Sequence, residues 1–196
     1  MKDRTEKKKM EHVLEKKPVS VYIPYSLLAA ALLFIFVKAL DNVPPKPFET
    51  EYPAEAFLAP GFELPTLNGG KISLKDYRGK VVFINFWATW CATCKVEMPS
   101  MQKVYDKFKD RGFEMLTISV DKDQKLIQPF MEEYNLTFPV LLDPDEEIAK
   151  QVYKTTGVPE TFIVSKSGVI VHKAIGPRDW ATEDAMAAFQ QLVEQS

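Results

Sequence analysis

Histidine and cysteine are scarce in this chain of 196 residues, which contains only two of each. A zinc site needs four ligands, drawn mainly from cysteine, histidine and carboxylate side chains. One of the two histidines, His12, belongs to an N-terminal tail that we expect on the other side of a membrane, and the other is His172. The supply of ligands is therefore too small for a zinc site, and we predict no metal.

Basic side chains are lacking where a nucleic-acid-binding domain would need them. Residues 41–196 carry 17 Lys and Arg against 23 Asp and Glu, a formal charge of −6, whereas residues 1–18 carry seven basic and four acidic side chains. A domain that binds nucleic acid is usually basic, so we expect no such partner. The hydrophobic content of 46% is enough for one domain with a buried core.

Charged residues are also missing from residues 19–37, which include the uninterrupted apolar run 27–37. As a helix this segment would extend about 28 Å, close to the hydrocarbon thickness of a bilayer. Basic residues precede it, and the positive-inside bias then places the N-terminus in the cytoplasm. A cleaved signal peptide is the alternative, because the apolar core is short and Val37-Lys38-Ala39 is an acceptable cleavage site.

The anchor interpretation divides the chain into four parts. We predict a cytoplasmic basic tail at residues 1–18, a single transmembrane anchor in the lipid of the cell membrane at 19–38, a proline-rich linker at 39–58 and a folded domain at 59–196. The linker and the folded domain would then be extracytoplasmic, in the bacterial periplasm or on the outer face of the cell.

The folded domain alternates between strand and helix patterns. Strands are predicted at 62–64, 71–74, 81–86, 113–120, 139–142, 160–164 and 169–172, and helices at 91–111, 124–134, 146–153 and from Thr182 to the C-terminus. The order predicts an α/β fold with an N-terminal hairpin and a mixed central sheet flanked by helices. The segment Val81–Phe86 is apolar at nearly every position, as expected for a strand covered on both faces.

Both cysteines belong to one Cys-x-x-Cys pair, Cys91 and Cys94, placed where the strand 81–86 gives way to a helix. One thiol then lies near the helix N-terminus, whose partial positive charge stabilises a thiolate, so the pair indicates a redox-active disulfide. A purely structural disulfide is disfavoured, because closing so short a loop removes only about 2 kcal/mol of unfolded-chain entropy.

The segment FWATWCATCKVEMP at residues 86–99, together with GVPETF at residues 157–162, resembles the thioredoxin superfamily. Within it, the chain is similar to the membrane-anchored TlpA/ResA/CcmG group of thiol–disulfide oxidoreductases over roughly residues 58–196. The resemblance implies a thioredoxin-like fold with a central insertion, and no cofactor besides the disulfide Cys91–Cys94.

The resemblance also implies roles for residues around the disulfide. Cys91 would be the exposed nucleophile that attacks a partner disulfide, and Cys94 the more buried thiol that resolves the mixed disulfide. Pro159 matches the superfamily's cis-proline and would present the Val158 backbone to an extended substrate. We expect Trp90 on the recognition surface next to the cysteines.

Two acidic residues near the disulfide have two interpretations each. Glu97 is either a first-turn acid favoured by the helix dipole or, as the family implies, a partly buried proton donor and acceptor for the dithiol. Glu160 is either a surface strand residue or a negative charge close to the disulfide, which would raise the thiol pKa and select partners.

These acids, and the uncharged Ala92 and Thr93 between the cysteines, disfavour a thiolate and so favour a reductant. A reductant outside the cytoplasm needs a membrane thiol-electron transporter as donor and an exported disulfide protein as acceptor. Apocytochrome c, with its C-x-x-C-H haem site, is the acceptor that the family implies. The alternatives are a general envelope disulfide reductase or isomerase, and a Cu(I) metallochaperone, for which only Met98, expected in the core, stands near as a third ligand.

Overall fold

The computed structural model describes residues 25–41 and 57–195, and the chain separates into two units, Met1–Pro44 and Pro45–Ser196. In the first unit the described part is helix α2 (Tyr25–Asp41). Among the described residues, no helix combines the length and the apolar character needed to cross a membrane. Residues 19–24 of the predicted anchor, the predicted tail and most of the predicted linker lie outside the described residues.

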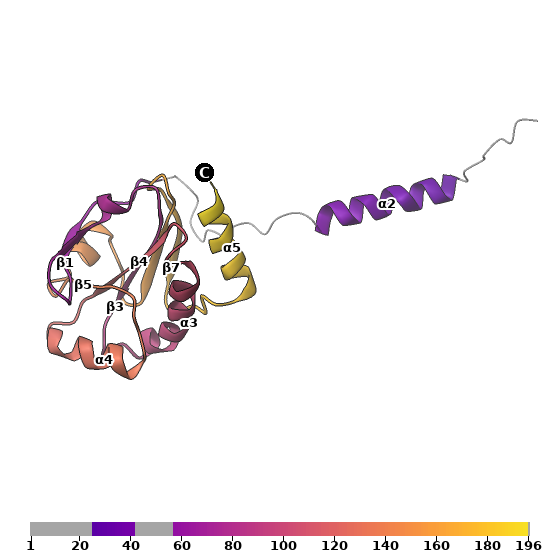
Figure 1. Ribbon diagram of the computed structural model, residues 1–196. Helices are drawn as coiled ribbons and strands as arrows, with labels where there is room; N and C mark the ends of the chain where they lie inside the picture. Colours follow the sequence, from indigo (N-terminus) through magenta and orange to yellow (C-terminus); the bar gives the residue numbers. More distant parts are fainter. Residues whose placement is uncertain (1–24, 42–56, 196) are drawn as a thin grey trace, which may run out of the picture. The chain divides into compact units, whose positions relative to one another are not determined.

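The second unit is built on a five-stranded sheet with the strand order β5-β4-β3-β6-β7 (Figure 1). Strand β3 pairs in parallel with β4 and β4 with β5, whereas β6 is antiparallel to both β3 and β7. The mixed central sheet predicted from the sequence is therefore confirmed. The strands are β3 (Val81–Trp87), β4 (Phe113–Ser119), β5 (Val140–Leu142), β6 (Glu160–Val164) and β7 (Ile170–Ile175).

One face of the sheet is covered by the helices α3 (Ala92–Phe108), α4 (Ile127–Glu133) and α5 (Glu183–Glu194). Phe83 of β3 packs against Phe189 of α5 with ring centroids 6.0 Å apart, and Trp87 packs against Phe130 of α4 at 5.1 Å. These aromatic contacts exclude water from that face and fix the helices on the sheet.

The opposite face of the sheet is covered by the short π-helix η4 (Glu147–Val152) and by the predicted hairpin, β1 (Glu63–Pro65) and β2 (Lys71–Ser73). Tyr153, which follows η4, has its ring 5.3 Å from that of Phe86 in β3 and 6.0 Å from that of Phe62 beside the hairpin. Because both faces of β3 are covered, all its side chains are buried, which explains its apolar sequence.

Most predicted elements differ from the structure by a few residues in their bounds, as two examples show. The predicted helix 124–134 is divided into a 3₁₀ turn, η3 (Gln124–Leu126), and α4. The last strand continues to Ile175 rather than ending at His172, because its pairing with β6 extends as far as Glu160. Both differences lie at ends of elements, where side-chain patterns carry the least information.

Parallel pairing places the C-terminal ends of β3 and β4 at one edge of the sheet, and the antiparallel strand β6 begins at that edge. Strand β3 leads there through residues 88–91 into α3. Ligands and reacting groups of open α/β sheets commonly lie beyond the C-terminal ends of such strands. A functional site is therefore expected at this edge.

Candidate active site

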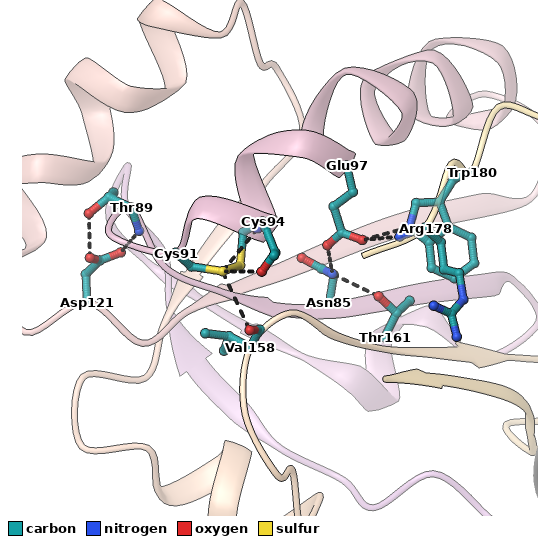
Figure 2. Close-up of a disulfide and its surroundings, with 11 residues drawn as sticks. Asn85, Thr89, Cys91, Cys94, Glu97, Asp121, Val158, Thr161, Arg178 and Trp180 are labelled. Atoms are coloured by element: carbon teal, nitrogen blue, oxygen red, sulfur yellow. Dashed lines mark hydrogen bonds between the residues drawn. A yellow bond between two sulfur atoms is a disulfide. The ribbon is translucent and has the colours of Figure 1, made fainter. Parts of the chain in front are cut away.

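Cys91 and Cys94 form a disulfide at the start of α3, with their Cα atoms 5.3 Å apart (Figure 2). Cys91 is the N-cap residue of the helix, and its Sγ accepts a hydrogen bond of 3.1 Å from the backbone N–H of Cys94. This donor and the helix N-terminus both favour negative charge on Cys91 after reduction. Cys91 is 5% exposed and Cys94 is fully buried, so Cys91 is the sulfur that a partner can reach.

Other residues predicted for the site lie beside Cys91. The carbonyl oxygen of Val158 is 3.6 Å from Cys91 Sγ, and the peptide bond between Val158 and Pro159 is cis, as the resemblance implies. Trp90 exposes 68% of its surface directly before the nucleophile, in agreement with its expected place on the surface. The structure thus brings Trp90, Cys91 and the Val158 backbone together, while their roles in binding a substrate stay predictions.

Glu97 is a buried acid in the second turn of α3, with 1% exposure. The first-turn interpretation is therefore wrong, since the first turn contains no acid. Burial penalises the charged carboxylate and raises the pKa of Glu97 from 4.5 to about 7. Hydrogen bonds from Asn85 and Trp180, together with the backbone and charge of Arg178, offset part of that rise.

The partners of Glu97 come from distant parts of the sequence (Figure 2). Its Oε1 accepts a hydrogen bond of 2.9 Å from Asn85 Nδ2, and its Oε2 accepts from Trp180 Nε1 at 3.2 Å and from the Arg178 backbone N–H at 3.3 Å. Asn85, a polar residue inside an apolar strand, is a signal of this network in the sequence. Arg178 and Trp180 were not predicted, because the local sequence pattern offers no signal for them.

A second buried carboxylate, Asp121, was also missed. It lies just beyond the end of β4 and accepts hydrogen bonds from the backbone N–H and the hydroxyl of Thr89, at 2.9 and 2.6 Å, and from the Ser119 hydroxyl at 2.8 Å. Thr89 belongs to the loop that precedes the nucleophile. Figure 2 shows Asp121 and Glu97 on opposite sides of the disulfide.

Glu160 is fully buried at the start of β6, so its interpretation as a surface residue is wrong and its side chain cannot contact a substrate directly. One oxygen pairs with Lys173 Nζ of β7 at 2.6 Å. The other oxygen accepts hydrogen bonds from the backbone N–H and the hydroxyl of Thr156, at 2.9 and 3.1 Å. The nearby ammonium group compensates the charge that Glu160 would otherwise bring to the disulfide.

A buried Cys-x-x-Cys disulfide with one accessible sulfur, at the edge of this mixed sheet and beside a cis-proline, defines a thiol–disulfide oxidoreductase with a thioredoxin-like fold. Residues 58–173 match the family model described as the AhpC/TSA family, and the chain belongs to that family.

Curated relatives support the same class. Over 135 residues the chain is 37% identical to the thiol-disulfide oxidoreductase ResA of Bacillus cereus, covering 69% of this chain and 76% of the relative. It is 36% identical over 136 residues to ResA of Bacillus subtilis, covering 69% of this chain and 74% of that relative. The predicted membership of this group of oxidoreductases is thereby confirmed.

Solved structures of similar proteins have the same fold. A putative thiol:disulfide interchange protein DsbE from Chlorobium tepidum superimposes with a TM-score of 0.65 and 26% identity, covering 72% of this chain and 99% of that one. StoA from Bacillus subtilis superimposes with a TM-score of 0.56 and 27% identity, covering 68% of this chain and 98% of that one.

Proposed function

We propose that this protein is an extracytoplasmic reductant of disulfides in exported proteins, with apocytochrome c as the acceptor that the resemblance implies. The observation that carries the direction of electron flow is Glu97, a buried acid one helical turn after Cys94 with a pKa of about 7. A negatively charged carboxylate in this position disfavours ionisation of the thiols to thiolates. It therefore favours the disulfide form of the protein, which is the property of a reductant.

Glu97 supplies this effect without a comparable contribution from Glu160. From the sequence, both acids were expected to disfavour a thiolate, but the ion pair with Lys173 compensates the charge of Glu160. Opposing Glu97, the Cys94 N–H and the helix N-terminus stabilise a thiolate on Cys91. The balance between these two influences sets the reduction potential.

The reaction proceeds through two exchanges. The Cys91 thiolate forms a bond to one sulfur of the partner disulfide, and the other partner sulfur leaves as a thiolate. The Cys94 thiolate then attacks Cys91 Sγ, closes the Cys91–Cys94 bond and releases the second partner sulfur. The partner has gained two electrons and becomes a dithiol, and this protein has lost the same two electrons.

Protons must move with these electrons. Cys94 has to lose its proton before it can attack, and a base with a pKa near the ambient pH is best suited to accept it. Glu97, on the same helix and with a pKa of about 7, fits that requirement at neutral pH. Release of that proton to the partner thiolate would complete the exchange.

Attachment to the membrane is part of the proposal. In α2 the consecutive residues from Leu32 to Phe36 are all apolar and each 60–64% exposed, so the helix is apolar around its circumference. The charge-free segment 19–37 and the basic residues before it support an anchor with the catalytic domain outside the cytoplasm. A membrane thiol-electron transporter would then re-reduce Cys91 and Cys94. Recovery of an N-terminal tag in washed membranes tests the anchor against a cleaved signal peptide.

The deciding experiment is the reduction potential of the Cys91/Cys94 couple in the full chain, equilibrated in detergent at neutral pH against thiol buffers of known potential. A value below about −220 mV supports a reductant. A value between about −120 and −180 mV would reverse the proposed electron flow.

The acceptor is tested separately with the reduced protein and two oxidised peptides, one with a Cys-x-x-Cys-His site and one in which alanine replaces that histidine. Faster reduction of the first peptide supports a role in cytochrome c maturation. Equal rates support the alternative of a general envelope reductase or isomerase. The Cu(I) metallochaperone has less support, because Met98 is fully buried in the core, as predicted.

A further inference from the structure

Two loops meet at the accessible sulfur of Cys91. Each is attached to a buried carboxylate by the N–H and the hydroxyl of one threonine. In the loop before the nucleophile, the N–H and the hydroxyl of Thr89 both donate to Asp121, at 2.9 and 2.6 Å. In the loop that carries Val158, the N–H and the hydroxyl of Thr156 both donate to Glu160, at 2.9 and 3.1 Å. We name these contacts the Thr89–Asp121 clamp and the Thr156–Glu160 clamp.

Each carboxylate is itself fixed to the sheet. Asp121 is 2% exposed and accepts a further hydrogen bond from Ser119, the last residue of β4. Glu160 has no exposed surface, belongs to β6 and pairs with Lys173 of β7. Hydrogen bonds to charged groups are stronger than those between neutral groups, and a threonine held through both its N–H and its hydroxyl has its backbone and its χ1 angle fixed together.

The clamped loops carry groups that a partner would meet first. Thr89 lies directly before Trp90, which is 68% exposed. Thr156 lies two residues before Val158, whose carbonyl oxygen is 3.6 Å from Cys91 Sγ. Figure 2 shows the Thr89–Asp121 clamp and Val158 on different sides of the disulfide. A segment that reaches Cys91 therefore has to fit between the two loops.

We propose that the two clamps together fix the position in which an extended segment of a partner protein is held while its sulfur reacts with Cys91. Thr89, Asp121, Thr156 and Glu160 are positioning residues in this proposal, because they act through Trp90 and Val158 and touch no reacting atom. The proposal depends only on the thiol–disulfide oxidoreductase activity, and it holds for either direction of electron flow.

The test compares two disulfides with the same leaving group. One is N-acetylcysteine amide joined to thionitrobenzoate, and the other is a short peptide whose single central cysteine is joined to the same group. Attack by Cys91 releases the same coloured thiolate from both, so the ratio of the two rates measures recognition of the peptide chain alone. Both rates are measured on the full chain carrying Cys94→Ser, which stops the reaction after the first exchange.

Thr89→Val and Thr156→Val each remove one clamp hydroxyl and keep the size of the side chain. We expect each substitution to lower the ratio of peptide rate to small-disulfide rate by about tenfold, the effect of one charge-assisted hydrogen bond, and to raise the peptide concentration that gives half the maximal rate. Thr89→Ser and Thr156→Ser retain a hydroxyl and should restore the ratio. Thr155→Val, whose hydroxyl belongs to neither clamp, serves as the matched control.

Three results would overturn the proposal: an unchanged ratio in both valine variants, a parallel loss of both rates, or a wild-type ratio showing no preference for the peptide. A parallel loss would mean that the clamps act on Cys91 or on the fold as a whole. Thermal unfolding of each variant separates those two cases. None of these results depends on the reduction potential, so the proposed direction of electron flow can fail independently.

Discussion

Asn85 donates a side-chain hydrogen bond of 2.9 Å to Glu97 and so joins the centre of strand β3 to the second turn of α3. The same amide group donates to Thr161 of β6 at 2.8 Å. In the part of the chain that the structure describes, the carbonyl oxygen Oδ1 of Asn85 is buried without a hydrogen-bond partner. The Asn85 side chain therefore links β3, α3 and β6 at the site, and its Oδ1 is an acceptor without a donor.

We expect Glu97→Gln to stabilise the oxidised protein in a pH-dependent way. Because the folded state holds the pKa of Glu97 at about 7 against 4.5, ionisation of this group opposes folding. That penalty is absent below pH 4.5, grows between pH 4.5 and 7, and reaches about 3 kcal/mol above pH 7. Glutamine cannot ionise, and a rotated Asn85 amide can offer its free Oδ1 to the new NH₂ group.

Denaturant unfolding of both proteins over that pH range measures the effect. The gain in the free energy of unfolding should be largest at the alkaline end and should vanish near pH 4.5. A difference between the proteins that stays constant with pH would contradict ionisation of Glu97 as the cause.

The same substitution should lower the pKa of the Cys91 thiol in the reduced protein, because it removes a negative charge that opposes a thiolate on the same helix. The rate of alkylation by iodoacetamide against pH reports this pKa directly. Glu133→Gln, at an exposed position on α4, is the matched control. Identical alkylation profiles for Glu97→Gln and the parent protein would remove Glu97 from the proposed mechanism.

Cys94→Ser should accumulate a covalent complex with a partner protein, and Cys91→Ser should not. Cys91 is the accessible sulfur, and only Cys94 can release a partner bound to it. Non-reducing gel electrophoresis of membranes after acid quenching of thiols shows the complexes. If both variants trapped partners equally, the roles of the two cysteines would have to be revised.

Lys173→Met should destabilise the fold, because it leaves the fully buried Glu160 without its ion pair. We expect a loss of about 2 kcal/mol, below the 3–5 kcal/mol typical of fully buried pairs, because the Lys173 side chain is 22% exposed. Adding Glu160→Gln to this variant should recover part of the loss. Failure of the double variant to recover any stability would show that Lys173 acts through its other contacts, such as that with the Phe162 ring.

The elements that carry the cysteines could be predicted from the sequence because their signals are local. An apolar strand, a Cys-x-x-Cys pair and a helical spacing of apolar residues follow one another directly between residues 81 and 108. The contacts that tune the site are not local. The hydrogen bond between Thr89 and Asp121 joins residues 32 positions apart in the sequence, and the one between Trp180 and Glu97 joins residues 83 positions apart.

Glu160 shows why burial of a charged residue is hard to predict. Its place at the start of a strand, next to a proline, is equally compatible with an exposed or a buried side chain. Burial of Glu160 depends on the register of β6 with β7, which places the side chain of Lys173 within reach of the Glu160 carboxylate. That register includes an irregularity between Ile163 and Val164, so counting residues along the two strands does not give it.

The hydrogen bond from the Cys94 backbone to Cys91 Sγ has a practical consequence for the chemistry. The donor is already aimed at the sulfur in the oxidised protein, so no main-chain atom has to reorient when charge develops there, and solvation of the nascent anion is in place before the bond breaks. Because the donor is an amide of the main chain, replacing the Cys94 side chain does not remove it. Cys94 thus has two roles that mutagenesis can separate: its backbone N–H solvates the nucleophile, and its sulfur ends the reaction.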